Sequence, residues 1–125
     1  MSDKIKLVLA GPDRVVEKGE YWGVVLPTAQ NNLTVIAGRA PSLICLKAGV
    51  VKLMNSADDM AKKLYIAEGV AEIADDVCTV SSEYVLTAPE ANIETVKSKL
   101  DSATRLREKV FYQEVYDDLI AFSKN

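Results

Sequence analysis

The feature that most constrains the fold of this chain is a change of hydrophobic period near residue 88. Before it, short apolar runs recur every eight to ten residues, separated by Gly, Pro, Asn or Asp. The run at 4–9 alternates apolar and polar residues, as a half-buried strand does. From residue 90 to 125 the chain contains neither Gly nor Pro, and apolar residues recur at the spacing of an amphipathic helix. The sequence therefore predicts a β domain followed by helices.

The N-terminal part predicts a series of short strands. The expected strands are 4–9, 14–17, 21–26, 33–36, 42–46, 50–54, 64–67, 70–73, 77–81 and 83–86. Turn-forming segments such as Gly11-Pro12-Asp13 lie between them. Many short strands at this spacing are typical of an antiparallel sandwich or a flattened barrel. A chain of 125 residues has room for one core of this kind and not two.

The C-terminal part predicts a helix that starts at a capping box, with Thr87 as the N-cap, Pro89 in the first turn and Glu90 three residues on. One apolar stripe comprises Ile93, Val96, Leu100, Ala103, Leu106 and Val110. A second stripe, displaced by one residue, comprises Phe111, Val115, Leu119 and Phe122. The displacement favours a break at Val110-Phe111 and a hairpin of two helices, with one long, kinked helix as the alternative.

The composition excludes several classes of catalytic site. The chain has no histidine, so it cannot hold a Ser-His-Asp triad, a Cys-His dyad, His-ligated zinc or a haem with a proximal histidine. Neither of the two common Gly-rich phosphate-binding loops is present. The pairs Asp58-Asp59 and Asp75-Asp76 lie in predicted turns, and Asp117-Asp118 lies in a predicted helix, where neighbouring side chains diverge. The net charge of −3 argues against a nucleic-acid partner.

The remaining candidate residues have structural interpretations. Cys45 and Cys78 lie in apolar runs and are predicted to be buried free thiols, and a cysteine nucleophile would need a base that the sequence lacks. Asp101 and Arg105 are four residues apart and predict a surface ion pair on one helix face. Four helical aromatic residues are predicted to pack rather than to bind a ligand: Phe111, Tyr112, Tyr116 and Phe122.

Several turns carry a resemblance to a known family. The segment 26–41 leads a strand into the turn Gly38-Arg39-Ala40-Pro41 and resembles the Gly-His-Ala-Pro turn of the epsilon subunit of F-type ATP synthases. The segments 8–13, 46–52 and 66–80 are similar to further elements of that family, in the same order and spacing. The resemblance covers essentially the whole chain.

The resemblance implies a mainly-β α+β fold, with a ten-stranded antiparallel β-sandwich over 1–86 and a C-terminal α-helical hairpin over 87–125. It implies a non-catalytic central-stalk subunit that couples ion flow through the c-ring to ATP synthesis, with a possible role in regulating ATP hydrolysis. The implied partners are the gamma subunit, the c-ring and the alpha and beta catalytic subunits. The segment Met1-Ser2-Asp3-Lys4 lacks signal-peptide features, which favours a peripheral place on the cytoplasmic face of a bacterial cell membrane.

The family pattern also points to contact residues. The loop that meets the c-ring in the family corresponds here to Gln30, Asn31 and Asn32, which predicts polar rather than charged contacts. Arg39, at the position of the family's histidine, and Pro41 are the predicted stalk-interface residues.

The family's nucleotide site has a weaker counterpart. Nucleotide-binding members carry an Asp and an Arg three residues apart, whereas the candidates here, Asp101 and Arg105, are four apart. We therefore expect no bound cofactor. The last helix, 111–125, holds one basic residue, Lys124, and three acidic ones, which argues against a strongly inhibitory helix that grips an acidic surface. A stand-alone nucleotide-sensing module is the alternative function.

Overall fold

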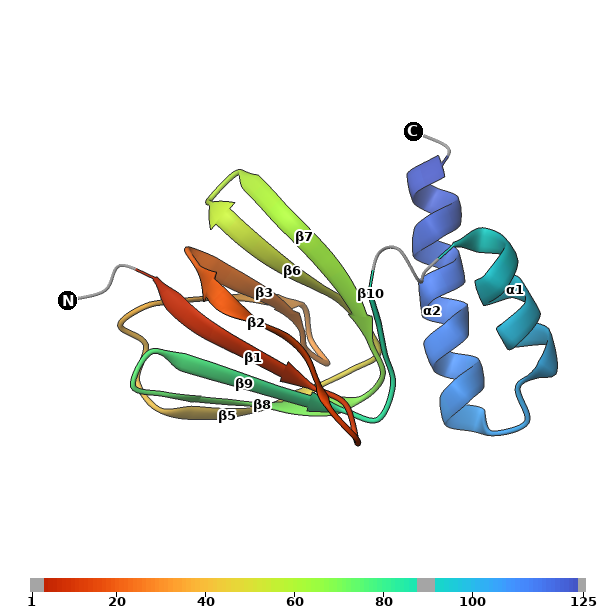
Figure 1. Cartoon of the computed structure of the whole chain (residues 1–125), viewed down its shortest axis with the longest axis horizontal. Helices are drawn as coiled ribbons and strands as arrows, with labels where there is room; N and C mark the ends of the chain where they lie inside the picture. The colour runs from red at the N-terminus through yellow and green to blue at the C-terminus, as the bar shows by residue number, and fades with distance from the viewer. Residues whose placement is uncertain (1–3, 88–91, 124–125) are drawn as a thin grey trace.

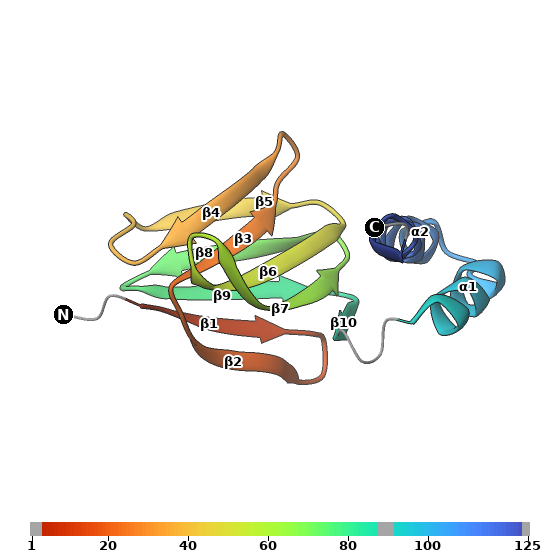
Figure 2. The ribbon, with the colours of Figure 1, turned by 90° about the horizontal axis from the view of Figure 1, so that it is seen from above.

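The chain folds into a β-sandwich followed by two helices (Figure 1). The structure is a computed structural model and describes residues 4–87 and 92–123, with the main chain alone for residues 122 and 123. The two helices lie beside one end of the sandwich, and the described chain begins at the opposite end (Figures 1 and 2). The expected β domain followed by a helical hairpin is confirmed.

Within the described residues, ten strands form two sheets of five. Sheet A has the order β2 (Val15–Tyr21), β1 (Ile5–Ala10), β9 (Val77–Ser82), β8 (Gly69–Ala74), β5 (Ser42–Leu46). Sheet B has the order β10 (Val85–Thr87), β7 (Asp59–Ile66), β6 (Gly49–Ser56), β3 (Gly23–Pro27), β4 (Asn32–Ile36). The sandwich prediction is confirmed, and the pairing is antiparallel except between β1 and β9, which run parallel.

Alternation along the strands builds the core between the sheets. In β1, Ile5, Leu7 and Leu9 are fully buried while the residues between them are not. Sheet B contributes the alternating residues Val24, Leu26, Val35, Val51, Leu53, Leu64 and Ile66. The period-2 pattern of the sequence therefore reports which face of each strand meets the other sheet.

Several strands are longer than the sequence predicts. β2 runs from Val15 to Tyr21, which leaves Trp22 in the connection to β3. β6 and β7 extend into the predicted turn at 55–59, so only residues 57 and 58 remain outside the strands. Ladder hydrogen bonds continue through polar residues on an exposed edge or face, where the apolar alternation that marks a strand is lost.

A tight turn joins β8 to β9 at the end of the sandwich opposite the helices. Asp75 and Asp76 adopt positive φ angles of 52° and 60°, as a two-residue hairpin turn requires. The Asp76 carboxylate accepts a hydrogen bond of 2.7 Å from the main-chain N–H of Gly38, which itself has φ of 89°. The predicted turn role of this acidic pair is confirmed, and it also anchors the 37–41 connection.

The first helix begins later than the sequence predicts. α1 spans Ile93–Ser102, and its N-cap is Asn92, whose side chain accepts a 2.8 Å hydrogen bond from the Thr95 N–H. The predicted cap at Thr87 is wrong because Thr87 is the last residue of β10 and pairs with Leu64. Pro89 and Glu90 of the predicted capping box lie outside the described residues. An Asn N-cap is as effective as Thr, so the local signal alone did not distinguish them.

The second helix, α2 (Leu106–Ser123), confirms the hairpin but not the predicted break. The chain leaves α1 at Ala103, which is extended, and residues 103–105 connect the helices. α2 runs without interruption through Val110 and Phe111. The displaced stripe marks the buried face of α2 instead: Phe111 is buried, whereas Leu106 is 76% exposed.

A second apolar cluster joins the hairpin to the sandwich. Val96 of α1 and Phe111 and Val115 of α2 are buried together with Tyr65 and Ala67 of the sandwich. The packing role predicted for the helical aromatic residues is confirmed for Phe111, Tyr112 and Tyr116; the side chain of Phe122 lies outside the described residues. α2 lies between α1 and the sandwich (Figure 2). Neither helix, over its described residues, is long and apolar enough to cross a bilayer.

Candidate functional site

The predicted c-ring contact residues form the tip and the first strand residue of the β3–β4 hairpin. The Thr28 N–H donates a 3.0 Å hydrogen bond to the Asn31 carbonyl oxygen, and the Asn31 N–H donates a 3.3 Å bond to the Thr28 hydroxyl oxygen. The Thr28 hydroxyl also donates to the Asn31 carbonyl oxygen. These bonds close the loop on itself and leave the side chains of Gln30, Asn31 and Asn32 exposed. The loop is a polar projection without charge.

The predicted stalk-interface residues lie at the other end of β4. Arg39 and Pro41 are exposed in the connection from β4 to β5. Four residue steps separate Asn32 from Ile36, or about 14 Å along the strand. The structure therefore does not bring the two predicted groups of contact residues together; they lie at opposite ends of β4.

The outer face of sheet A is more apolar than the sequence analysis anticipated. Leu43 is 72% exposed and Val70 is 40% exposed, and Cys45 lies directly opposite Val70 in the β5–β8 register. Cys45 is exposed, so its predicted burial is wrong. Its neighbours in sequence are apolar, but the pleat of β5 turns the Cys45 side chain outward while Leu46 points into the core.

Cross-strand registers extend this surface across sheet A. Val8 of β1 lies opposite Thr79 of β9, which lies opposite Glu72 of β8. The apolar residues of the outer face are Val8, Ala10, Val15, Leu43, Cys45, Val70, Ala74 and Val77. The sequence signal for this surface is a strand that carries apolar residues on both of its faces, as β1 does.

The contact between hairpin and sandwich centres on Asp118 of α2. The Tyr65 hydroxyl donates a 2.7 Å hydrogen bond to the Asp118 carboxylate, and the Lys63 Nζ lies 3.0 Å from the same oxygen. Lys52 is the direct cross-strand partner of Lys63, so the Asp118 carboxylate lies near two positive charges. Partial burial opposes ionisation, but the bonds from Tyr65 and Lys63 outweigh it and lower the pKa of Asp118. Asp118 thus ties α2 to sheet B.

Asp117 shows that the adjacent acidic residues diverge, as the sequence predicted. Its carboxylate accepts a 2.8 Å hydrogen bond from Gln113 on the same helix. The described residues contain no group of three or more side chains arranged to hold a metal ion.

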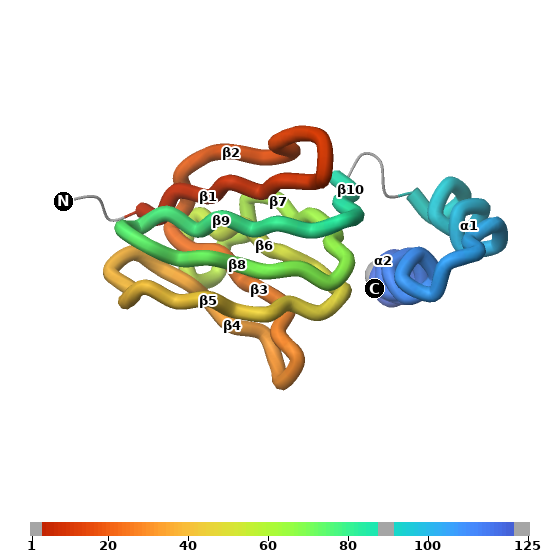
Figure 3. Tube along the Cα trace, turned by 90° about the horizontal axis from the view of Figure 1, so that it is seen from below, coloured from red at the N-terminus to blue at the C-terminus, as the bar shows by residue number. Residues whose placement is uncertain are grey.

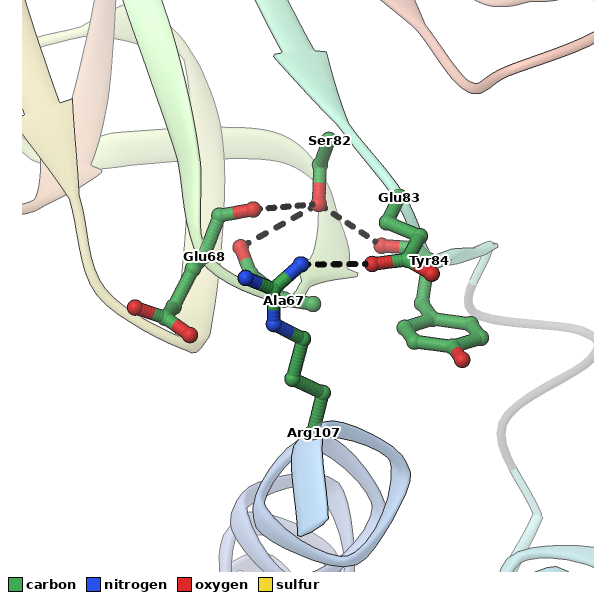
Figure 4. Close-up of polar contacts among 6 residues, drawn as sticks. All are labelled: Ala67, Glu68, Ser82, Glu83, Tyr84 and Arg107. Carbon is green, nitrogen blue, oxygen red and sulfur yellow. Dashed lines mark hydrogen bonds and ion pairs between the residues drawn. The ribbon is translucent and has the colours of Figure 1, made fainter. Parts of the chain in front are cut away.

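A second polar contact lies where β7 and β9 meet the helices (Figure 4). The buried Ser82 hydroxyl lies 3.1 to 3.2 Å from three main-chain carbonyl oxygens, those of Ala67, Glu68 and Tyr84. The Ser82 hydroxyl has one hydrogen, so it donates to one of these carbonyl oxygens at a time. Arg107 of α2 reaches Glu83 at 3.2 Å beside them. These hydrogen bonds hold the segment 82–84 against the segment 67–68, and the Arg107–Glu83 ion pair links α2 to it.

The Asp101–Arg105 ion pair predicted on a helix face is wrong. Asp101 lies in the last turn of α1 and pairs with Lys97 at 3.1 Å, whereas Arg105 lies in the connection between the helices. Asp101 lines an open surface hollow on α1 rather than an enclosed site. The other thiol, Cys78, is buried as predicted, and burial raises its pKa to about 11, which suppresses the nucleophilic thiolate.

Comparisons with known proteins identify relatives of the β-sandwich. The sequence model of the family described as ATP synthase, Delta/Epsilon chain, beta-sandwich domain matches residues 4–88. An ATP synthase epsilon chain of Granulibacter bethesdensis is 31% identical over 97 residues, which cover 78% of this chain and 71% of that one. An ATP synthase epsilon chain of Agrobacterium fabrum is 27% identical over 103 residues, covering 82% and 75%.

Solved structures share the fold. A chain in the Euglena gracilis mitochondrial ATP synthase OSCP/F1/c-ring structure has a TM-score of 0.71 at 17% identity, covering 98% of this chain and 83% of that one. A chain in the Tetrahymena thermophila mitochondrial ATP synthase central stalk and c-ring structure has a TM-score of 0.58 at 17% identity, covering 95% and 93%. Together with the match over 4–88, these observations show that the chain belongs to the ATP synthase delta/epsilon chain family.

Proposed function

We propose that this chain is a non-catalytic subunit of the central stalk of an F-type ATP synthase, which couples ion flow through the c-ring to ATP synthesis. Membership of the delta/epsilon chain family supports the assignment. The surfaces described above support it further, because they suit protein contacts rather than bond-breaking chemistry. The chain would sit at the cytoplasmic face of a bacterial membrane and be held there through its partners.

The outer face of sheet A is the proposed docking surface for the gamma subunit. Leu43 of the edge strand β5 and Val70 of the neighbouring strand β8 place apolar side chains in solvent on this face, and Lys6 and Glu72 provide polar groups on it. Stable protein interfaces combine apolar contact area with polar groups in this way. A large exposed apolar surface on a sheet is itself a sign of a partner.

The hairpin loop with Gln30, Asn31 and Asn32 is the proposed c-ring contact, and Arg39 and Pro41 are proposed to contact the stalk. Since these groups lie at opposite ends of β4, the sandwich can span two partners at once. We assign the stalk and c-ring contacts to the sandwich, residues 1–86, and regulatory contacts with the catalytic subunits to the hairpin, residues 87–125.

The test is binding of the purified chain to the purified gamma subunit, with two matched variants. Val70→Lys and Met60→Lys each place a charge at a position that is exposed to a similar degree, 40% and 43%, on sheets A and B respectively. We expect Val70→Lys to weaken binding by about tenfold or more, because it buries a charge in the interface, and Met60→Lys to leave it unchanged. Absence of wild-type binding at micromolar concentration, or the reverse order of the variants, would overturn the assignment.

We expect no ATP site at Asp101 and Arg105. Arg105 lies outside α1, and the Asp101 carboxylate is engaged by Lys97. Calorimetry with ATP and the purified chain tests this, and submillimolar binding that is lost in Asp101→Ala would restore the nucleotide-sensing alternative. The purified chain is also expected to hydrolyse no ATP.

A further inference from the structure

Asp76 of the β8–β9 turn lies beside the connection that joins β4 to β5 (Figure 3). The main chain of Asp76 has φ of 60°, and its carbonyl oxygen accepts a 2.9 Å hydrogen bond from the Lys6 N–H of β1. The side-chain oxygen Oδ1 of Asp76 accepts the 2.7 Å hydrogen bond from the Gly38 N–H. Asp76 is therefore held by sheet A through its main chain and holds the connection through its side chain.

Two hydrogen bonds hold the main chain on either side of Arg39. The N–H of the preceding residue is bound by Asp76, and the carbonyl oxygen of the following residue, Ala40, accepts a 2.9 Å hydrogen bond from the Ser42 hydroxyl. Pro41 restricts its own φ angle as well. The main chain at Arg39 is thus fixed from both sides, although residues 37–41 lie outside the strands.

The Arg39 side chain is available to a partner. It is exposed, and it forms no ion pair with the part of the chain that the structure describes. A guanidinium binds a carboxylate or carbonyl oxygen with directional N–H groups, so its contacts depend on where the main chain places it. A main chain that is already fixed has less conformational entropy to lose when the contact forms.

The β8–β9 turn does not itself require the Asp76 carboxylate. A two-residue hairpin turn of this kind needs positive φ at both positions, and Gly adopts positive φ at no steric cost. Asp75 has φ of 52° and the same role in the turn, but its side chain forms no hydrogen bond with the described residues. The two Asp residues therefore differ in one contact, the bond from the Gly38 N–H to Asp76.

We propose that Asp76 is a positioning residue for the stalk contact: its bond to the Gly38 N–H holds the 37–41 connection in the conformation in which Arg39 meets the gamma subunit. The inference rests on the proposed function. Asp76 acts through Arg39 and needs no contact of its own with the partner. A turn between two strands of sheet A thereby supports a contact made by the residues that follow β4 of sheet B.

The test is a double-mutant cycle on binding of the full chain to the purified gamma subunit, with Asp76→Gly, Arg39→Ala and both changes together. Asp76→Gly keeps the positive φ of the turn and removes the carboxylate. We expect Arg39→Ala to weaken binding about tenfold and Asp76→Gly about fivefold. The double variant should bind within about twofold of Arg39→Ala, whereas a merely structural role of Asp76 would give the same weakening with and without Arg39.

Two matched variants separate the hydrogen bond from the charge. Asp75→Gly removes a negative charge from the same turn and leaves the bond to Gly38 intact, while Asp76→Asn removes the charge and keeps an acceptor oxygen. Both should bind the gamma subunit within about twofold of the wild type. In the free chain, the Gly38 N–H should exchange its hydrogen about fivefold faster in Asp76→Gly than in the wild type or Asp76→Asn. Melting temperatures report that each variant is folded.

The outcomes distinguish this inference from the proposed function. Absence of wild-type binding to the gamma subunit would overturn the proposed function and the inference with it. If the wild type binds, the inference alone falls when Arg39→Ala or Asp76→Gly binds as the wild type does. It also falls when Asp76→Gly weakens binding equally with and without Arg39, or when Asp75→Gly weakens it as much. Unchanged exchange of the Gly38 N–H in Asp76→Gly would overturn it without any use of the gamma subunit.

Discussion

Asp118 is predicted to couple the stability of the hairpin to that of the sandwich, and a double-mutant cycle can measure the coupling. The changes are Tyr65→Phe and Asp118→Ala, alone and together. Tyr65 is buried and donates to the Asp118 carboxylate at 2.7 Å. Tyr65→Phe removes only the hydroxyl, and Asp118→Ala removes its acceptor at a helix position where Ala is well tolerated.

The size of each effect follows from the contacts. A hydrogen bond to a charged group contributes about 1.5–3 kcal/mol, and the Asp118 side chain is 35% exposed, so we take the lower end, about 1.5 kcal/mol, for Tyr65→Phe. Asp118→Ala also removes the ion pair with Lys63 and leaves the Tyr65 hydroxyl without the Asp118 acceptor, for a loss of about 2 kcal/mol. The double variant should lose no more than about 2 kcal/mol, because both changes remove the same bond. The coupling energy is then about 1.5 kcal/mol.

The assay is urea unfolding followed by circular dichroism at 222 nm for the helices and by Trp22 fluorescence for the sandwich. Asp117→Ala is the matched control, because among the described residues the Asp117 carboxylate bonds to Gln113 of the same helix and to no group of the sandwich. The loss of stability in Asp117→Ala should stay within about 0.5 kcal/mol. A coupling energy below about 0.5 kcal/mol would refute the reasoning. Equal losses in Asp117→Ala and Asp118→Ala would do so as well.

The contact between Asp118 and Tyr65 also predicts that the stability of the chain falls at acidic pH. The pKa of Asp118 is lowered in the folded chain, so its contribution is present above the unfolded pKa of about 4. It is lost as the pH falls through the folded pKa. The wild type should therefore lose more stability than Asp118→Ala on acidification below pH ~4, as urea midpoints will show.

Three further outcomes are expected. Gly69→Ala should destabilise the fold by about 2–4 kcal/mol, because a Cβ at this position would lie 2.1 Å from a main-chain oxygen of β9. Gly11→Ala is the control and should cause no such loss, because a Cβ there would lie 3.9 Å from the nearest atom. Melting temperatures of the two variants measure the difference. A thiol reagent should label exposed Cys45 fast and buried Cys78 only as the chain unfolds. Burial and a neighbouring carboxylate raise the pKa of Tyr21 to about 12. The stability that the Tyr21 hydroxyl contributes should therefore be lost as the pH rises from about 10 towards 12. In urea unfolding over this pH range, the free energy of unfolding of Tyr21→Phe should fall less steeply than that of the wild type.

The strands were predictable because their signals are local. Alternation in 4–9 identified the buried face of β1, and the Asp75-Asp76 pair marked a hairpin turn by its chemistry. Strand ends were less predictable, because the ladder continues through polar residues at exposed positions, as in β2. The family pattern identified the β3–β4 loop and the 37–41 turn as landmarks, and the strand predicted between them at 33–36 is observed as β4.

The helices were harder because their limits depend on tertiary contacts. Thr87 has the chemistry of an N-cap, but its pairing with Leu64 in sheet B holds it in a strand. The stripe through Leu106 and Val110 looked continuous with that of α1, yet the sandwich buries the neighbouring face of α2, which carries Phe111. Periodicity shows that a helix has an apolar face; it does not show which of two adjacent faces a partner covers.

The exposed apolar residues on sheet A have a physical explanation. A chain that folded alone would gain nothing from Leu43 at 72% exposure on this sheet. The exposed side chains are regular in space, since they lie in register across neighbouring strands. A face of side chains in register favours a broad docking surface. Val70→Lys should therefore weaken binding to the gamma subunit while it changes the free energy of unfolding of the free chain by less than about 0.5 kcal/mol, because Val70 is a surface position that only a partner would bury.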